Sequence, residues 1–296
     1  MSKGYEALRH GAAWLDLSAR ARFVVRGRDR ARYLHNLTSN EIKKMTPESS
    51  CYAFLLTPQG RIQADLDVFC CADHFLLDTE SELREKVPAL ILKYKVADQV
   101  ELEDVTTQTA SVGVEGPDAA PLRAALTEPD FTVLDATVTG QPGFRVFCAA
   151  EKLPELIRRL EAAGAVAADA ADARAVRIEN GRPRYGEDIR ETSLPQETQQ
   201  MRAVSFNKGC YLGQEIVERI RAQGRVNKLL VRLELETSEP VPPATKLTAD
   251  GKEAGEITSS VFSPRSGRVA ALGIVRTPYA TSGAALQAGA LTARVV

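Results

Sequence analysis

A nine-residue segment, residues 207–215, constrains the local fold and chemistry more than any other part of the sequence. It places Cys210 beside Lys208 and between Gly209 and Gly213, ahead of an amphipathic pattern that predicts a helix. Glycine lacks a Cβ atom, so the backbone can adopt a positive φ or approach a ligand closely. A neighbouring lysine or the positive end of a helix dipole lowers a thiol pKa. Cys210 is therefore a candidate reactive group; the alternative is a small buried hydrophobe, as most free cysteines are.

The same segment, NKGCYLGQE, resembles the signature of the YgfZ family, tetrahydrofolate-binding proteins related to the T protein of the glycine cleavage system. The segment RIENGRPRYG at residues 177–186 resembles the one in which that family's glutamate holds the pterin ring. Residues 57–66, TPQGRIQADL, resemble its glycine-then-aspartate hairpin. Residues 255–259 and 271–273 resemble its C-terminal barrel. The resemblance spans nearly the whole chain and implies tetrahydrofolate, or a one-carbon derivative of it, as the cofactor.

The resemblance assigns Glu179 to the pterin ring. The ring presents an N3–H and a 2-amino group side by side, and a carboxylate can accept both as parallel hydrogen bonds. Glu179 is also expected in the last turn of a helix, where the negative end of the dipole disfavours an anion unless something compensates. The alternative is that Glu179 pairs with Arg182 or Arg184 on the surface.

Asp65 takes the place of the aspartate that, in the T protein, lies near the folate nitrogen carrying the one-carbon unit. The T-protein pattern has two adjacent aspartates, whereas here Ala64 precedes Asp65 and Asp67 lies two positions further on. This departure counts against aminomethyl transfer. The alternative is that Asp65 and Asp67 follow the period-2 alternation of a strand with one solvent face.

Four residues near Cys210 complete the candidate set. Lys208 is grouped with Cys210 and Asp65 as catalytic, while Tyr211 and Arg219 are grouped with Glu179 and Asp65 as folate-binding. Arg219 and Arg221 are candidates for contacts with the glutamate tail of a folate. The alternatives are a solvated surface charge for Lys208, a core position for Tyr211 and a solvated helix face for both arginines.

Bulk properties exclude several classes of protein. The chain has 38 basic and 39 acidic residues, so composition gives no general attraction to nucleic acid or anionic membrane. No apolar run approaches the ~20 residues of a membrane span, and the N-terminus has no signal-peptide core, which predicts a cytoplasmic protein. Five cysteines without a Cys-x-x-Cys pair argue against a disulfide framework. Three histidines without an i,i+4 pair predict no metal site.

The first three quarters of the chain predict an α+β body. Residues 51–79 have the pattern of antiparallel strands around a turn with Pro at its second and Gly at its fourth position. Residues 81–94 predict a helix that Pro88 should bend or split. Residues 110–163 follow a β-α-β-β-α order, which suits a ferredoxin-like unit, and a further helix is expected over 169–180.

The residue pattern changes in the C-terminal part of the chain. Residues 231–235 alternate strictly between apolar and charged side chains, and prolines at 240, 242 and 243 interrupt the chain. This pattern predicts a small β-barrel. We therefore expect a GcvT/YgfZ-like α+β fold with two domains: residues 1–225 as a folate-binding body of two interleaved subdomains with ferredoxin-like units, and residues 226–296 as a C-terminal β-barrel.

The family resemblance implies a tetrahydrofolate-binding protein that assists iron–sulfur cluster assembly or repair in client proteins, with Cys210 as its reactive group. The alternative is an aminomethyltransferase of the glycine cleavage type, which moves a one-carbon unit from a lipoyl-bound intermediate to tetrahydrofolate. Asp65 and Glu179 favour that alternative, but its chemistry needs no cysteine. RNA binding is a third hypothesis, which the balanced charge and 6% aromatic content do not favour.

Overall fold

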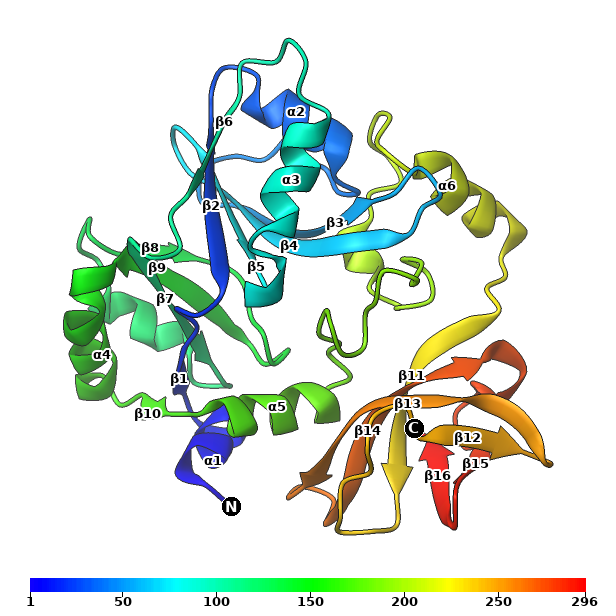
Figure 1. Cartoon of the computed structure of the whole chain (residues 1–296). Coiled ribbons are helices and arrows are strands. Elements are labelled where there is room, and N and C mark those ends of the chain that lie inside the picture. Colours follow the sequence, from blue (N-terminus) through cyan, green and yellow to red (C-terminus); the bar gives the residue numbers. More distant parts are fainter.

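A computed structural model describes residues 1–296, in which two five-stranded sheets and a closed barrel form three parts (Figure 1). The first sheet has the order β3-β4-β5-β2-β6 and is antiparallel throughout. The predicted turn at residues 57–60 joins β3 to β4, which confirms the antiparallel reading of this region. The strands of this sheet are β2 (Ala21–Arg26), β3 (Ser50–Leu56), β4 (Ile62–Cys70), β5 (Phe75–Thr79) and β6 (Glu101–Asp104).

Helices cover one face of the first sheet, and one of them explains how Pro88 is accommodated. The predicted helix over 81–94 is split into a 3₁₀ turn and α3, but the break comes before Pro88. Pro88 is the third residue of α3, where the N–H that proline lacks would have no partner inside the helix. These elements are α2 (Arg30–Leu37), the 3₁₀ turn η1 (Ser81–Leu83) and α3 (Lys86–Lys93).

The second sheet takes one of its inner strands, β1, from the N-terminal part of the chain, so the two sheets are interleaved in sequence. Its order is β10-β1-β7-β9-β8, and β1 pairs with β7 although the whole first sheet lies between them in the chain. Two 3₁₀ turns and α4 accompany it. The elements are β1 (Ala13–Asp16), β7 (Thr109–Glu115), η2 (Ala120–Ala125), β8 (Thr132–Leu134), β9 (Gly143–Ala149), η3 (Ala150–Lys152), α4 (Leu153–Ala162) and β10 (Val166–Ala167).

Helices α1 (Lys3–His10) and α5 (Ala170–Glu179) pack together below the second sheet. Helix α5 begins at a capping box, in which Asp169 and Asp172 exchange side-chain and backbone hydrogen bonds. The predicted helix over 169–180 is thus confirmed, and α5 reaches from the second sheet to the barrel.

The C-terminal region is a closed barrel with the order β11-β14-β13-β12-β15-β16, as its alternating pattern predicts. Closure leaves no exposed strand edge. Before it lie η4 (Met201–Ala203) and α6 (Gln214–Gln223). The barrel elements are β11 (Lys228–Leu235), β12 (Lys246–Ala249), β13 (Lys252–Ser263), β14 (Arg268–Arg276), η5 (Thr277–Tyr279), β15 (Ala285–Ala288) and β16 (Leu291–Val295).

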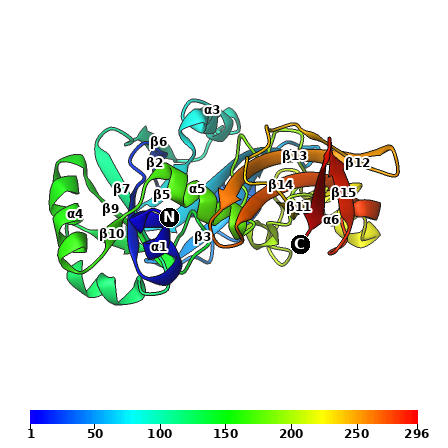
Figure 2. The same cartoon turned by 90° about the horizontal axis from the view of Figure 1, so that it is seen from below.

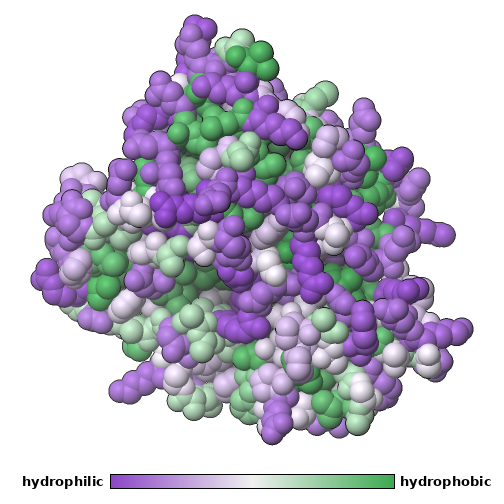
Figure 3. All heavy atoms as spheres, in the orientation of Figure 1, coloured by the Kyte–Doolittle hydropathy of each residue, from purple (hydrophilic) through white to green (hydrophobic).

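The three parts are held together by apolar contacts. Ile178 of α5 packs with Leu230 and Leu272 of the barrel, and Tyr211 and Val217 join the core of the first sheet. Seen from below, the barrel and the second sheet lie at opposite ends of the molecule (Figure 2). Hydrophilic side chains gather over the centre of the face seen in Figure 3. None of the helices has both the length and the apolar character that crossing a bilayer requires.

Candidate functional site

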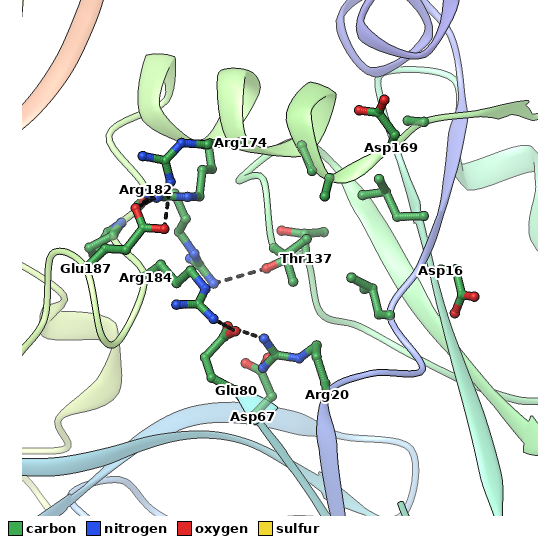
Figure 4. A pocket seen from close by; sticks show the side chains of 18 of the residues that line it. Asp16, Arg20, Asp67, Glu80, Thr137, Asp169, Arg174, Arg182, Arg184 and Glu187 are labelled. Carbon is green, nitrogen blue, oxygen red and sulfur yellow. Dashed lines mark hydrogen bonds and ion pairs between the residues drawn. The ribbon is translucent and has the colours of Figure 1, made fainter. Parts of the chain in front are cut away.

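A cavity of about 770 Å³ lies where the first sheet, the second sheet and α5 meet (Figure 4). Asp65 and Asp67 of β4 line it on one side, and Trp14 of β1 and Arg174 of α5 line it on the other. Its size lies within the usual range of small-molecule sites, roughly 300–1,000 Å³. The cavity thus joins segments that are far apart in the sequence.

Strand geometry explains why both aspartates face this cavity. Side chains alternate between the faces of a strand, so Ala64 and Leu66 enter the core of the first sheet while Asp65 and Asp67 share the opposite face. That face is covered, and both aspartates are about 9% exposed. The alternative that they lie on a solvent face is therefore wrong.

Asp65 has one bound and one free carboxylate oxygen. Tyr52 donates a hydrogen bond from its hydroxyl to Oδ2 at 2.7 Å, whereas Oδ1 is buried without a hydrogen-bond partner. Burial, aided by the negative charge of Glu80, raises the pKa of Asp65 to about 6. Asp65 therefore combines a fixed orientation, an unpartnered oxygen buried beside the cavity and a pKa suited to proton transfer near neutral pH.

Ion pairs make one wall of the cavity rigid. Glu80 receives both Arg20 and Arg184, the latter at 2.9 Å (Figure 4). Behind this wall Arg145 of β9 is fully buried, with its guanidinium 3.2 Å from Asp78 and 3.8 Å from Asp67. These ion pairs of Arg145 connect the second sheet to the first.

Glu179 lies elsewhere, between the body and the barrel, and it does not line the cavity. Tyr5 donates a hydrogen bond to it at 2.8 Å, and Arg9 and Ser263 also donate to its carboxylate. Arg9 supplies the positive charge that a carboxylate at a helix C-terminus needs. The alternative, in which Glu179 pairs with Arg182 or Arg184 on the surface, is wrong. The assignment of Glu179 to a pterin ring stays a prediction.

Lys208 is buried, and its side chain forms hydrogen bonds with the backbone. Its ammonium donates hydrogen bonds to the carbonyls of His35, Thr38 at 2.6 Å and Asn40 at 2.8 Å, at and beyond the C-terminal end of α2. Burial lowers its pKa to about 8. The alternative of a solvated surface charge is wrong. Lys208 fixes the loop that carries Cys210.

Cys210 is exposed, so the alternative of a small buried hydrophobe is wrong. It also lies outside the helix that was expected to begin near it, because α6 starts at Gln214 after Gly213 at φ 82°. Helix-dipole effects fall off within the first turn. The structure therefore shows an accessible thiol on a fixed loop, separate from the cavity.

The two glycine-containing segments recognised in the sequence pack against each other. A Cβ atom on Gly213 would lie 2.5 Å from the carbonyl oxygen of Thr57 and 3.2 Å from Gly60. Both glycines have positive φ values. The turn of the aspartate hairpin and the loop of the cysteine segment can approach this closely only because neither has a side chain there.

The remaining candidates do not reach the cavity. Tyr211 is buried in the core of the first sheet, as the core alternative proposed, with its ring 4.8 Å from the ammonium of Lys208. Arg219 is exposed on α6, on the solvated helix face that its alternative proposed. Among the predicted site residues, only Asp65 lines the cavity. No three His, Cys, Asp or Glu side chains are placed to hold a metal ion.

Sequence reasoning missed Tyr52, Glu80 and the arginines of the wall. Tyr52 lies in the strand before the recognised turn, opposite Asp67 in register and diagonal to Asp65. Pairing across the hairpin could have identified Tyr52. No sequence spacing could have identified Arg20 or Arg145, because the segments that carry them meet Asp78 only in the folded chain.

Comparison with known proteins agrees with this architecture. Residues 1–137 match the family model described as the GCVT N-terminal domain, and residues 228–296 match the glycine cleavage T-protein C-terminal barrel domain. The chain therefore contains both regions and has the mixed α+β GcvT-like fold with a closed six-stranded barrel.

Individual relatives extend over nearly the whole chain. An aminomethyltransferase from Rubrobacter xylanophilus is 29% identical over 94% of this chain and 79% of its own length. A putative chloroplastic transferase from Arabidopsis thaliana is 25% identical over 96% of this chain and 70% of its own. The crystal structure of the glycine cleavage system aminomethyltransferase T from Bartonella henselae superposes with a TM-score of 0.89 at 20% identity, covering 99% of this chain and 87% of that one.

Proposed function

We propose that this chain binds a tetrahydrofolate in the cavity between its two sheets and acts as a folate-dependent one-carbon transferase of the aminomethyltransferase kind. The observation that carries the proposal is Asp65, whose free Oδ1 lies buried at a cavity of suitable volume. The relatives named aminomethyltransferase support the same reaction class. The proposal departs from the expectation that the missing second aspartate counts against such transfer.

The chemistry requires a base at the folate nitrogen. When that nitrogen forms its bond to the transferred carbon, the bond between this carbon and the lipoyl sulfur breaks and its electron pair leaves on the sulfur. The nitrogen must then lose a proton, and Asp65 Oδ1 would accept it. With a pKa of about 6 the carboxylate is mostly ionised at neutral pH and still basic enough to take the proton. Tyr52 holds the other oxygen and so fixes the direction in which Oδ1 points.

The test has two stages. Calorimetric titration of tetrahydrofolate into the wild-type protein and Asp65→Asn, with folding checked by circular dichroism, measures binding. A glycine cleavage assay with the other components supplied then measures methylene-tetrahydrofolate. We expect both proteins to bind and the variant to be slower by about 10²–10⁴, the usual contribution of general acid–base catalysis. No product from the wild type would eliminate the transferase.

A second candidate function is assistance to iron–sulfur cluster assembly or repair, as the YgfZ resemblance implies. The observation that favours it is the exposed Cys210 on a loop fixed by Lys208, which aminomethyl transfer leaves without a role. The cluster would be cargo shared with a client or assembly protein. We expect Cys210→Ser to fold and bind folate normally yet fail in a maturation assay of a cluster enzyme. Full activity of that variant would exclude this function.

A further inference from the structure

Two arginines beside Asp65 have no carboxylate partner. The guanidinium of Arg202 lies 4.2 Å from the centre of the Tyr52 ring, and that of Arg182 lies 5.5 Å from it. Arg182 lines the cavity, whereas Arg202 lies next to it, against the ring of Tyr52, which does line it. The other arginines that line it are all within ion-pair distance of a carboxylate: Arg20, Arg174, Arg177 and Arg184.

The hydrogen bonds of the pair are to neutral groups only. Arg182 donates to the carbonyl oxygen of Thr137 at 3.2 Å (Figure 4), and Arg202 has a long contact of 3.5 Å with the side-chain oxygen of Gln200. Arg202 is exposed overall, but partial desolvation of its guanidinium, together with the positive charge of Arg182, lowers its pKa, and the negative charges of Asp67 and Asp65 offset only part of this shift. Two like charges held near each other are unfavourable, and an anion bound beside them would relieve the repulsion.

Tyr52 connects these charges to the reactive carboxylate. Its hydroxyl donates to Asp65, while its ring faces Arg182 and Arg202. A ligand that places its reacting nitrogen at Asp65 and extends past the ring would bring its other end to the arginines. Tetrahydrofolate has this arrangement, because its one-carbon nitrogens lie at one end of the aminobenzoyl ring and its glutamate carboxylates at the other.

We propose that Arg182 and Arg202 form a carboxylate-binding subsite for the glutamate tail of the folate. The inference rests on the proposed folate function and extends it to the recognition of the tail. It replaces the expectation that Arg219 and Arg221 contact the tail. Arg219 is exposed on α6, and Arg221 pairs with Glu218 at 3.6 Å, so neither is placed at the cavity.

The experiment compares two ligands that differ only in the tail. Tetrahydrofolate and tetrahydropteroate, which lacks the glutamate, are titrated calorimetrically into wild type, Arg182→Gln and Arg202→Gln. Arg225→Gln, at an exposed arginine that does not line the cavity, is the matched control, and Arg219→Gln tests whether the tail binds at α6 instead. We expect each subsite variant to bind tetrahydrofolate about tenfold more weakly, as loss of one charged contact implies, and to bind tetrahydropteroate as wild type does. The control should bind both ligands unchanged.

The outcomes separate this inference from the proposed function. If Arg182→Gln and Arg202→Gln bind tetrahydrofolate as tightly as wild type, or weaken both ligands equally, the subsite is refuted while folate binding stands. If the wild type prefers tetrahydrofolate and only Arg219→Gln removes that preference, the tail lies at α6. If the wild type binds neither ligand, the folate proposal fails and the subsite fails with it. Circular dichroism shows that each variant is folded.

Discussion

Ser263, the last residue of β13, donates a hydrogen bond from its hydroxyl to Glu179, the last residue of α5. The same carboxylate receives Tyr5 and Arg9 from α1. One buried side chain therefore connects the N-terminal helix, the helix that leaves the second sheet and the barrel. This arrangement makes Glu179 a point of contact between parts that the sequence places far apart.

Replacement of Glu179 should destabilise the protein strongly. In Glu179→Ala the buried guanidinium of Arg9 would lose its counter-charge, and breaking such a pair costs about 3–5 kcal/mol. Ser263→Ala removes one hydrogen bond from the same carboxylate and should cost about 1 kcal/mol. Urea denaturation measures both. Equal small losses in the two variants would show that the ion pair contributes little.

The milder variant Glu179→Gln separates this structural role from the pterin role that the family resemblance implies. If Glu179 only joins the helices and the barrel, the folded variant should bind tetrahydrofolate as wild type does. Calorimetric titration decides the question, with circular dichroism as the check on folding. Lost binding in a folded Glu179→Gln protein would place the pterin ring at this carboxylate instead.

Ionisation of the buried Asp65 carboxyl group should lower the stability of the fold as pH rises toward neutral. Its pKa is about 6 in the folded chain against 3.8 normally, so the folded state binds more protons between these values and stability falls as pH rises through them. Asp65→Asn removes this cost, which amounts to at most about 3 kcal/mol. Urea denaturation at pH 4 and pH 7.5 should show a stability advantage for the variant only at the higher pH. A pH-independent difference would contradict the raised pKa.

Thiol reagents should distinguish Cys210 from the other cysteines. Cys210 is the exposed one, and burial raises the pKa of Cys51 to about 12 and that of Cys71 and Cys148 to about 11. The pKa of Cys70 is raised as well. Folded protein should show one fast-reacting thiol with Ellman's reagent, and Cys210→Ser should abolish it. More than one fast thiol would mean that these burial patterns are wrong.

Loss of Lys208 should loosen the segment around Cys210. Lys208→Met would leave three carbonyl groups, two of them buried and one half-buried, without this donor, which we expect to cost about 2–4 kcal/mol. Lys44→Met is the control, because the side chain of Lys44 is 78% exposed and surface changes usually fall within about 0.5 kcal/mol. Thermal and urea denaturation provide the comparison. Similar stabilities for both variants would argue against the buried hydrogen bonds.

Gly213 and Gly224 provide a matched pair at the two ends of α6. Both have positive φ values, 82° and 64°, so alanine should cost about 1 kcal/mol at either position for the backbone alone. At Gly213 the new Cβ would also meet the carbonyl of Thr57 at 2.5 Å, whereas at Gly224 nothing lies within 4 Å. Gly213→Ala should therefore be markedly less stable in urea denaturation. Equal losses would show that the hairpin turn moves aside without cost.

Local patterns in the sequence were enough to predict many individual elements. The turn at 57–60, the capped helix over 169–180 and the alternating barrel strands all follow from contacts between residues near in sequence. The effect of Pro88 on the helix was harder to predict. Proline is tolerated in the first turn of a helix, and the sequence did not show at which residue α3 begins. Asp65 was identified through the resemblance of residues 57–66 to the family's hairpin, because strand alternation alone favoured a solvent-facing position.

The sequence by itself determined the α+β and barrel classes, the candidate carboxylates and the single cysteine in a glycine-rich loop. Only the tertiary structure decided that Asp65 enters a cavity while Glu179 and Lys208 are used in internal contacts. The physical reason is that burial and ion pairing depend on segments such as α1 and α5, which meet only after folding. The charge and chemical type of each side chain follow from the sequence, whereas its solvent accessibility and its hydrogen-bond and ion-pair partners depend on how the chain packs.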